Sequence, residues 1–300
     1  MSAPTLQEYA GRVRSPQLQG GLRVRGKGPV SAPQRPLLSV ITAVLNRREK
    51  VERMIQSVAA QSYSNIEHIL IDGGSTDGTV DVLRRYDDTL AYWISEPDRG
   101  IFDAMNKGMA LASGDYVSIL NSDDAYAPDC AERVAREIEV THADVIYGDY
   151  IFQLEDLNLQ KRIVASLNLE KGMTIGHAYF VSRKLLERVG LFDLDYRFAS
   201  DLDFAIRLRQ SGATFAKVDA ALQYFSSGGA AELHLSEASR EGTRIMKQRL
   251  GSRAGLYYRL MTWKRIFLRA AGGAFGSGAA RAIRRRYYLA SGYHEITPAS

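Results

Sequence analysis

The chain has 300 residues, of which 45% are hydrophobic and 24% are charged, a composition typical of a soluble globular protein. Its single cysteine, Cys130, excludes an internal disulfide and disfavours a cysteine-based zinc site. No run of about 18 apolar residues exists and no apolar core follows the N-terminus, so we expect neither a transmembrane helix nor a secretory signal.

The net charge of +5 is distributed unevenly. Residues 1–36 carry six Lys or Arg and one acid, and residues 242–300 carry twelve Lys or Arg and one acid, which leaves residues 37–241 at −11. Basic ends favour contact with an anionic surface, either a membrane or a nucleic acid. We expect a disordered basic arm over residues 1–36, a folded domain over residues 37–241 and a basic helical extension over residues 242–300.

Strand and helix patterns alternate from residue 37 onwards. Four apolar runs predict buried strands: residues 37–45, 66–72, 90–95 and 116–120. Apolar residues at helical spacing predict helices between them, over residues 51–61, 80–86 and 101–112. Later residues predict a helix over 128–140, strands over 144–150, 162–167 and 178–181, and a helix that begins near Ser200. This alternation argues for an α/β fold with a mostly parallel, doubly wound sheet.

Two adjacent carboxylates, Asp123 and Asp124, follow the fourth predicted strand and precede Pro128, which suits the first turn of a helix. Ligands of α/β sheets bind where strands end, and such a pair can hold a hard divalent cation that also grips a substrate diphosphate. The alternative is an Asx turn that caps the helix near Pro128.

Asp72 ends the second predicted strand and precedes two glycines. A carboxylate there can accept hydrogen bonds from a nucleobase, and the glycines let a ligand approach closely. The alternative is an aspartate that only forms the turn. The chain lacks the Gly-x-Gly-x-x-Gly and Gly-x-x-x-x-Gly-Lys-Ser/Thr patterns, which disfavours a dinucleotide fold and a P-loop.

The C-terminal stretch has a different composition. Residues 242–294 contain no Asp or Glu, and residues 256–269 mix aromatic, aliphatic and cationic side chains at helical spacing. This pattern is typical of a basic amphipathic helix that lies in a membrane interface. The alternative is a helix that packs its apolar face on the body and exposes its arginines to water.

Several motifs, in order over residues 37–230, resemble family 2 glycosyltransferases. Residues 39–47 read Ser-Val-Ile-Thr-Ala-Val-Leu-Asn-Arg, and residues 71–79 read Ile-Asp-Gly-Gly-Ser-Thr-Asp-Gly-Thr. Residues 95–108, Ser-Glu-Pro-Asp-Arg-Gly-Ile-Phe-Asp-Ala-Met-Asn-Lys-Gly, are similar to a bacterial polysaccharide, colanic-acid-type branch. Leu-Asn-Ser-Asp-Asp at residues 120–124 resembles the metal motif, although Asn121 stands where many relatives carry Asp. Residues 201–208, Asp-Leu-Asp-Phe-Ala-Ile-Arg-Leu, resemble the segment with the catalytic base.

The resemblance implies the nucleotide-sugar-binding fold called GT-A and an inverting transfer of a hexose from a UDP-sugar. It makes Asp201 the catalytic base. It assigns donor binding to six residues: Asn46, Asp72, Asp98, Arg99, Asp103 and Asp123. It implies that Asp123 and Asp124 bind a divalent cation, Mg²⁺ or Mn²⁺. It also implies that His177 and Asp203 contact the acceptor or the diphosphate.

These residue types suit an in-line displacement, in which a carboxylate takes the proton of the attacking hydroxyl and a divalent cation neutralises charge on the departing diphosphate. We predict a cytoplasmic enzyme, peripheral on the inner face of the membrane, that extends a polyprenyl-diphosphate-linked glycan in cell-surface polysaccharide biosynthesis. The alternatives are an inactive nucleotide-sugar-binding protein, which the retained Asp123 and Asp201 argue against, and a nucleic-acid-binding protein, for which no motif is present.

Overall fold

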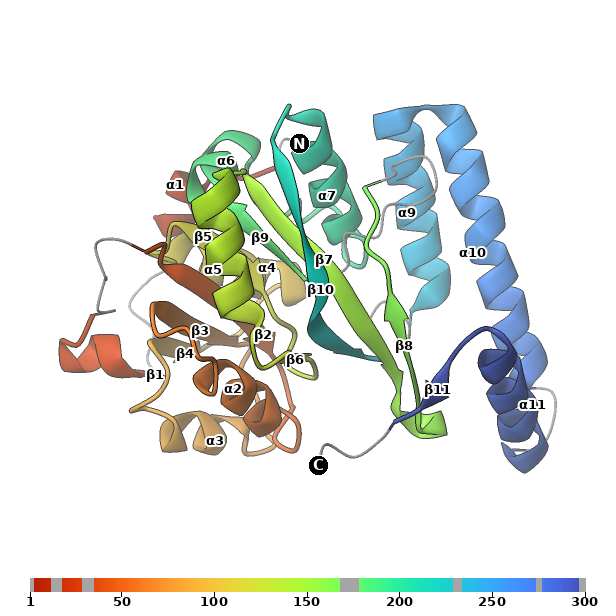
Figure 1. Ribbon diagram of the computed structural model, residues 1–300, viewed down its shortest axis with the longest axis horizontal. Helices are drawn as coiled ribbons and strands as arrows, with labels where there is room; N and C mark the ends of the chain where they lie inside the picture. Colours follow the sequence, from red (N-terminus) through yellow and green to blue (C-terminus); the bar gives the residue numbers. More distant parts are fainter. Residues whose placement is uncertain are drawn as a thin grey trace.

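A mixed eleven-stranded sheet forms the centre of the molecule, and helices cover both of its faces (Figure 1). This computed structural model describes residues 3–11, 18–28, 35–167, 178–228, 234–273 and 277–296. None of the helices in those ranges is both long and apolar enough to span a membrane.

The predicted strand–helix alternation is confirmed, and its first four strands form the parallel part of the sheet. They lie side by side in the order β4 (Tyr92–Ser95), β3 (Ile66–Asp72), β2 (Leu38–Val44) and β5 (Tyr116–Ile119). Because these strands are parallel, their carboxyl ends share one edge of the sheet.

The second half of the sheet is mixed. Beyond β5 the order continues with β9 (Tyr179–Ser182), β7 (Val145–Leu154), β10 (Phe215–Ser226) and β6 (Ala125–Tyr126). β7 and β10 are parallel, whereas β9 and β6 run antiparallel to their neighbours. The strand predicted over residues 162–167 lies earlier in the chain, as β8 (Leu159–Ile163), which pairs antiparallel with β7.

Each face of the sheet has its own hydrophobic core. The helices α2 (Val51–Ala59), α3 (Thr79–Arg85) and α5 (Cys130–Thr141) contribute to one core, and α4 (Ile101–Leu111), α6 (Arg183–Val189) and α7 (Ser200–Gln210) contribute to the other. In β2, Val40 belongs to the first core and Ile41 to the second, as the two-residue period of a strand requires.

The prediction of a disordered arm over residues 1–36 is wrong for residues 3–11 and 18–28. Helix α1 (Leu6–Ala10) buries Tyr9 in the core that includes α4, and β1 (Leu18–Gly20) pairs antiparallel with β4. The 3₁₀ helix η1 (Leu22–Arg25) brings the Arg23 guanidinium within 2.5 Å of the buried Glu67 carboxylate. A few anchoring side chains therefore order a segment whose Gly and Pro content indicated disorder.

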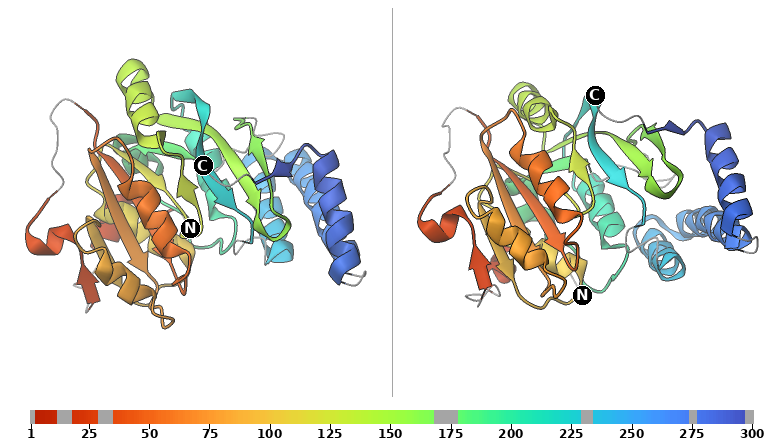
Figure 2. Two further views of the ribbon diagram at one scale, coloured as in Figure 1. Left: turned by 60° about the horizontal axis from the view of Figure 1, so that its bottom comes forward. Right: turned by 90° about the horizontal axis from the view of Figure 1, so that it is seen from below.

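The predicted boundary between residues 241 and 242 falls inside the helix α9 (Leu235–Leu250). Ile245 and Met246 of α9 are fully buried in a cluster that includes Ile206 of α7. The chain continues as α10 (Ser252–Gly273) and α11 (Ser277–Ala290), and β11 (His294–Glu295) then pairs with β8. These elements lie together beyond the β8 end of the sheet (Figures 1 and 2).

We predict that Ile245→Ala lowers the free energy of unfolding by about 2–5 kcal/mol, because it removes a fully buried side chain between α9 and the body. Denaturant unfolding should show one transition that shifts as a whole, as it should for Ile206→Ala. Val140→Ala, at a position that is 79% exposed, is the matched control. If Ile245→Ala left the main transition unchanged, α9 would be a separate extension.

Candidate functional site

Four side chains predicted to bind a donor follow the carboxyl ends of the four parallel strands. Asn46 comes after β2, Asp72 ends β3, Asp98 comes after β4 and Asp123 comes after β5. Since these strands are neighbours in the sheet, the structure brings the four loops to one edge. Such an edge is where ligands of α/β sheets bind.

Asp72 is fully buried, and both of its carboxylate oxygens accept hydrogen bonds from its own turn, while one of them also accepts from β4. Its Oδ2 accepts hydrogen bonds from the backbone N–H of Gly74 at 3.1 Å and of Ser75 at 2.9 Å, and from the Ser95 hydroxyl at 2.6 Å. The Ser75 hydroxyl donates to Oδ1. The turn-forming role is therefore present in the structure, and contact with a nucleobase stays a prediction.

Asn46 joins the loop after β2 to the turn after β3. Its backbone lies in the left-handed region at φ 50°, which asparagine tolerates better than most residues. Its Oδ1 accepts from the Thr76 N–H at 2.9 Å, and its own N–H donates to the Ser75 hydroxyl at 2.7 Å. Asn46 therefore connects the loop after β2 to the turn after β3 through two hydrogen bonds. The side chain of the neighbouring Leu45 is 50% exposed.

Asp98 lies against the turn of β3. A Cβ added to Gly73 would clash with a carboxylate oxygen of Asp98, so a larger residue at that position would displace the Asp98 side chain. Burial raises the pKa of Asp98, whereas a hydrogen bond from the Gly100 N–H and the charge of Lys107 lower it; the charges of Asp103 and Asp72 make smaller raising contributions. This crowding of carboxylates favours the approach of a cation or of hydrogen-bond donors.

Asp103 is only 4% exposed and binds within the protein. It accepts hydrogen bonds from the Tyr9 hydroxyl and from the side chain and backbone of Arg99, at 2.9 and 3.1 Å for the latter two. Burial raises the pKa of Tyr9 to about 12, and Asp103 adds to this rise. The prediction that Asp103 binds the donor is therefore corrected: its carboxylate fastens α1 to α4. The side chain of Arg99 is 63% exposed and can still contact a donor.

The adjacent aspartates Asp123 and Asp124 differ in burial and in their hydrogen-bond partners. Asp124 is 1% exposed, and its Oδ1 accepts from the Ser226 N–H at 2.9 Å. Its Oδ2 accepts from the Gln223 amide at 2.9 Å and from the Asn121 amide at 3.0 Å. Burial raises the pKa of Asp124 to about 7, and the charge of Asp123 contributes. The predicted metal-ligand role of Asp124 is thus corrected, because its carboxylate fastens the loop to β10.

Asp123 is half-buried, and its carboxylate makes no hydrogen bond or ion pair with the part of the chain that the structure describes. Within those same residues, no group of three or more His, Cys, Asp or Glu side chains is arranged to hold a metal ion. A single free carboxylate fits a Mg²⁺-like cation that takes its other ligands from a bound diphosphate and water. Asp123 can therefore contribute to such a site but cannot enclose an ion with Asp124.

Asp201 lies half-buried in the first turn of α7, where the Leu202 N–H donates to its Oδ1 at 2.8 Å. Asp203, by contrast, is fully buried between Arg207 of α7 and Arg249 of α9, with both Nε–O distances at 2.8 Å. The prediction that Asp203 faces the acceptor or diphosphate is corrected accordingly. His177 lies outside the described residues.

The sequence analysis missed Glu241 of α9. Its carboxylate accepts hydrogen bonds from three consecutive backbone N–H groups, those of Arg197 at 3.0 Å, Phe198 at 2.7 Å and Ala199 at 3.1 Å. These residues form the loop that leads into α7, so Glu241 fixes the segment just before Asp201. Glu241 lies beyond residues 37–230, the stretch that contains the recognised motifs, so no motif indicated its role.

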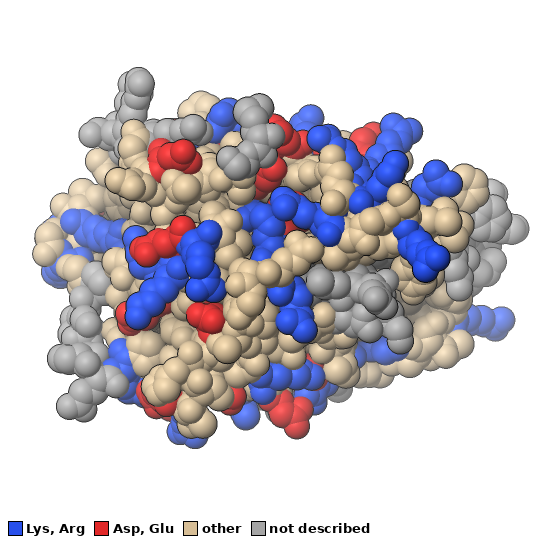
Figure 3. All heavy atoms as spheres, turned by 90° about the horizontal axis from the view of Figure 1, so that it is seen from above, with Lys and Arg blue, Asp and Glu red and all other residues tan. Residues whose placement is uncertain are grey.

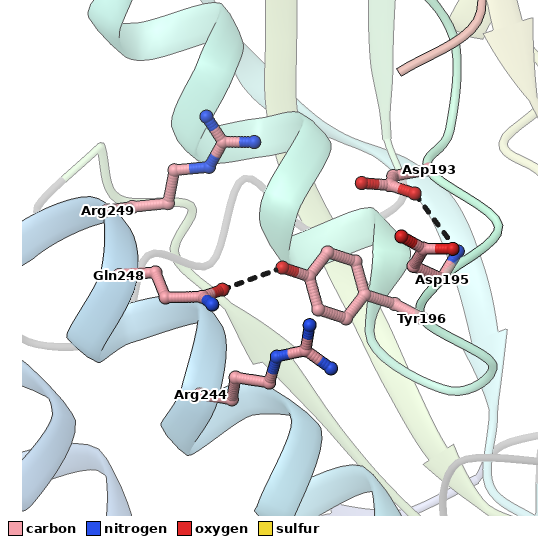
Figure 4. A pocket seen from close by; sticks show the side chains of 6 residues that line it. All are labelled: Asp193, Asp195, Tyr196, Arg244, Gln248 and Arg249. Carbon is pink, nitrogen blue, oxygen red and sulfur yellow. Dashed lines mark hydrogen bonds between the residues drawn. The ribbon is translucent and has the colours of Figure 1, made fainter. Parts of the chain in front are cut away.

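A polar cavity of about 240 Å³ lies between the segment before α7 and α9 (Figure 4). Six residues line it: Asp193, Asp195, Tyr196, Arg244, Gln248 and Arg249. The Tyr196 hydroxyl donates to the Gln248 side chain at 2.9 Å, and the Arg244 guanidinium lies 5.4 Å from the Tyr196 ring centre. The cavity is thus part of the contact that joins α9 to the loop.

Solved structures with this fold bind nucleotide sugars. A mannosyltransferase from Pyrobaculum calidifontis, in complex with GDP-Man and Mn²⁺, covers 95% of this chain and 87% of its own at a TM-score of 0.60 and 20% identity. S. aureus TarS in complex with UDP covers 77% of this chain and 71% of its own at a TM-score of 0.57 and 18% identity. These similarities confirm the predicted GT-A fold.

Sequence comparison gives the family. An uncharacterised glycosyltransferase of Mycobacterium tuberculosis is 34% identical over 189 residues, which cover 57% of this chain and 68% of the relative. A PGL/p-HBAD biosynthesis glycosyltransferase of Mycobacterium bovis is 33% identical over 177 residues, which cover 57% of this chain and 69% of the relative. A family model described as Glycosyl transferase family 2 matches residues 39–190, and the chain therefore belongs to that family.

Proposed function

We propose that this glycosyltransferase moves a hexose from a UDP-sugar to a hydroxyl of a glycan acceptor, with inversion at the anomeric carbon. The observation that carries the proposal is the division of the aspartate pair, in which Asp124 is fixed and Asp123 is left free at the shared edge of four parallel strands. Complexes of related folds with UDP-GlcNAc and with GDP-Man and Mn²⁺ support a nucleotide-sugar donor and a divalent cation.

The donor would bind across the loops after β2, β3 and β4. The half-exposed Leu45 offers an apolar contact for the base, beside the turn that Asp72 and Asn46 keep rigid. Asp98, which lies beside Gly73, and the exposed Arg99 supply an acceptor and a donor of hydrogen bonds. Loops that are already held by hydrogen bonds lose little conformational freedom when a ligand binds.

Asp123 would hold the cation, Mg²⁺ or Mn²⁺, with the donor diphosphate completing the coordination. When bound, such an ion neutralises the charge that builds on a departing diphosphate. The fixed Asp124 keeps the loop in place, so Asp123 meets the diphosphate without a rearrangement of the chain.

Asp201 would act as the base. Its carboxylate takes the proton from the acceptor hydroxyl while that oxygen attacks the anomeric carbon, and the bond from this carbon to UDP breaks with its electron pair leaving on the diphosphate. The Leu202 N–H donates to the Asp201 carboxylate and orients it in the first turn of α7. One displacement of this kind inverts the anomeric configuration.

We further propose that the acceptor glycan grows on a polyprenyl diphosphate at the cytoplasmic face of the membrane, in cell-surface polysaccharide biosynthesis of the colanic-acid type. The support is the acid-free basic stretch over residues 242–294, which complements an anionic surface.

Release of UDP from a panel of UDP-sugars with Mg²⁺ or Mn²⁺ tests the function. We expect metal-dependent turnover of one sugar, and a loss of about 10²–10⁴-fold in Asp201→Asn with UDP binding kept, because the variant cannot accept the proton. Asp219→Asn, at a position 99% exposed, is the control. Failure of every UDP-sugar to bind would refute the proposed donor class, and unchanged turnover in Asp201→Asn would refute its role as base.

We predict that Glu241→Ala lowers turnover by about 10–100-fold at unchanged affinity for UDP, because the loop before Asp201 loses its anchor. Glu241→Gln, which keeps one acceptor oxygen, should recover part of the rate. Glu237→Ala, on an exposed position of the same helix, should match the wild type. A parallel loss of UDP affinity would mean general damage to the fold instead.

A further inference from the structure

Helix α10 exposes large apolar side chains along one face. Leu256, Leu260 and Trp263 follow helical spacing and are 52%, 61% and 67% exposed. Tyr257 and Met261 lie beside them and are 40% and 50% exposed. The outward face of a surface helix ordinarily carries polar residues. We call these five residues the apolar face of α10.

The opposite side of α10 is already used for packing on α9. Gly255 is buried, the Tyr258 ring lies against Gly242, and the Thr262 hydroxyl lies 2.7 Å from that of Ser239. These three α10 positions recur at helical spacing on the side towards α9. Over residues 252–263, where the structure describes the side chains, the helix therefore turns small and hydroxyl-bearing residues towards the body and leaves the apolar face uncovered.

The apolar face lies in a strongly basic part of the sequence. Residues 252–290 carry nine Lys or Arg and no Asp or Glu, and Arg253 and Arg259 of α10 are both exposed. Figure 3 shows Lys and Arg but no Asp or Glu at the right-hand end of the face seen from above, where α10 lies in Figure 1. Such a combination matches a partner that is apolar inside and anionic at its surface.

We propose that the apolar face of α10 inserts into the interface of an anionic lipid bilayer. A helix in that position buries its apolar side chains at the boundary between headgroups and acyl chains, while its cations contact the headgroups. The apolar face is the convex side of a single helix, which a protein partner could cover only with a matching groove but which lipid covers without one.

Membrane docking through α10 rests on the proposed function, because it adds how the enzyme is held near a lipid-linked acceptor. Because α9 joins α10 to the loop before Asp201 through Glu241, docking of α10 would fix the base relative to the membrane surface. A lipid-linked acceptor would then reach the site from the side on which the enzyme is held.

Vesicle flotation tests the docking surface with the full chain. The wild type should bind vesicles of equal parts phosphatidylglycerol and phosphatidylcholine, and binding should weaken with added salt and with phosphatidylcholine alone. The triple variant Leu256→Ser, Leu260→Ser, Trp263→Ser should lose about tenfold or more in apparent affinity, because it removes buried apolar area. Val140→Ser, a change of an apolar residue on α5 that is 79% exposed, should bind like the wild type.

Tryptophan emission gives a second readout without any substitution. The chain has two tryptophans, and Trp93 is only 1% exposed, so a blue shift on adding vesicles would report Trp263 entering an apolar environment. Absence of the shift, or equal vesicle binding by the triple variant, would overturn the inference. So would light scattering that shows a wild-type dimer converted to a monomer by the triple variant, because a second copy would then cover the face.

UDP-sugar hydrolysis without vesicles separates this inference from the proposed function. The triple variant should keep the wild-type rate in solution. Hydrolysis without vesicle binding would refute the membrane inference alone, and vesicle binding without hydrolysis of any UDP-sugar would refute the proposed function alone.

Discussion

The buried carboxylate of Asp124 is the constraint on which the candidate site depends. A buried charge is costly unless it is fully hydrogen-bonded, and Ser226, Gln223 and Asn121 supply that bonding. The cost remains visible in the pKa of Asp124, which burial raises to about 7. In return, the loop after β5 is fastened to β10, a strand about a hundred residues further along the chain. Asp123 is thereby presented on a fixed backbone, and its carboxylate makes no hydrogen bond or ion pair with the described residues.

A similar arrangement supports the proposed base. Two side chains of α9 hold the segment around Asp201 from both sides, Glu241 through the backbone before α7 and Arg249 through the Asp203 carboxylate. The residues that match the family model end at 190, so this support comes from a part of the chain outside that match. The helix that positions the base also carries α10, which links the chemistry of the site to the surface through which we propose the enzyme meets the membrane.

The sequence predicted well what depends on local pattern. Apolar runs located the parallel strands, and strand ends located Asp72 and Asp123 at one edge. It predicted poorly what depends on distant partners. Asp103 and Asp124 have the residue type of ligands for a donor or metal, yet each is buried by a group remote in sequence, such as Tyr9 for the former. The order of the N-terminal segment was missed for the same reason, since composition does not reveal a few long-range anchors.

The most direct test compares Asp123→Ala with Asp124→Ala by calorimetric titration of UDP with and without Mn²⁺ and by thermal unfolding. We expect Asp123→Ala to keep the wild-type melting temperature but to lose the Mn²⁺-dependent part of UDP binding. Asp124→Ala should lower the melting temperature, because the Ser226 N–H and the Gln223 amide lose their buried partner. Metal-dependent binding that survives in Asp123→Ala, or an unchanged melting temperature in Asp124→Ala, would contradict these separate roles of the two aspartates.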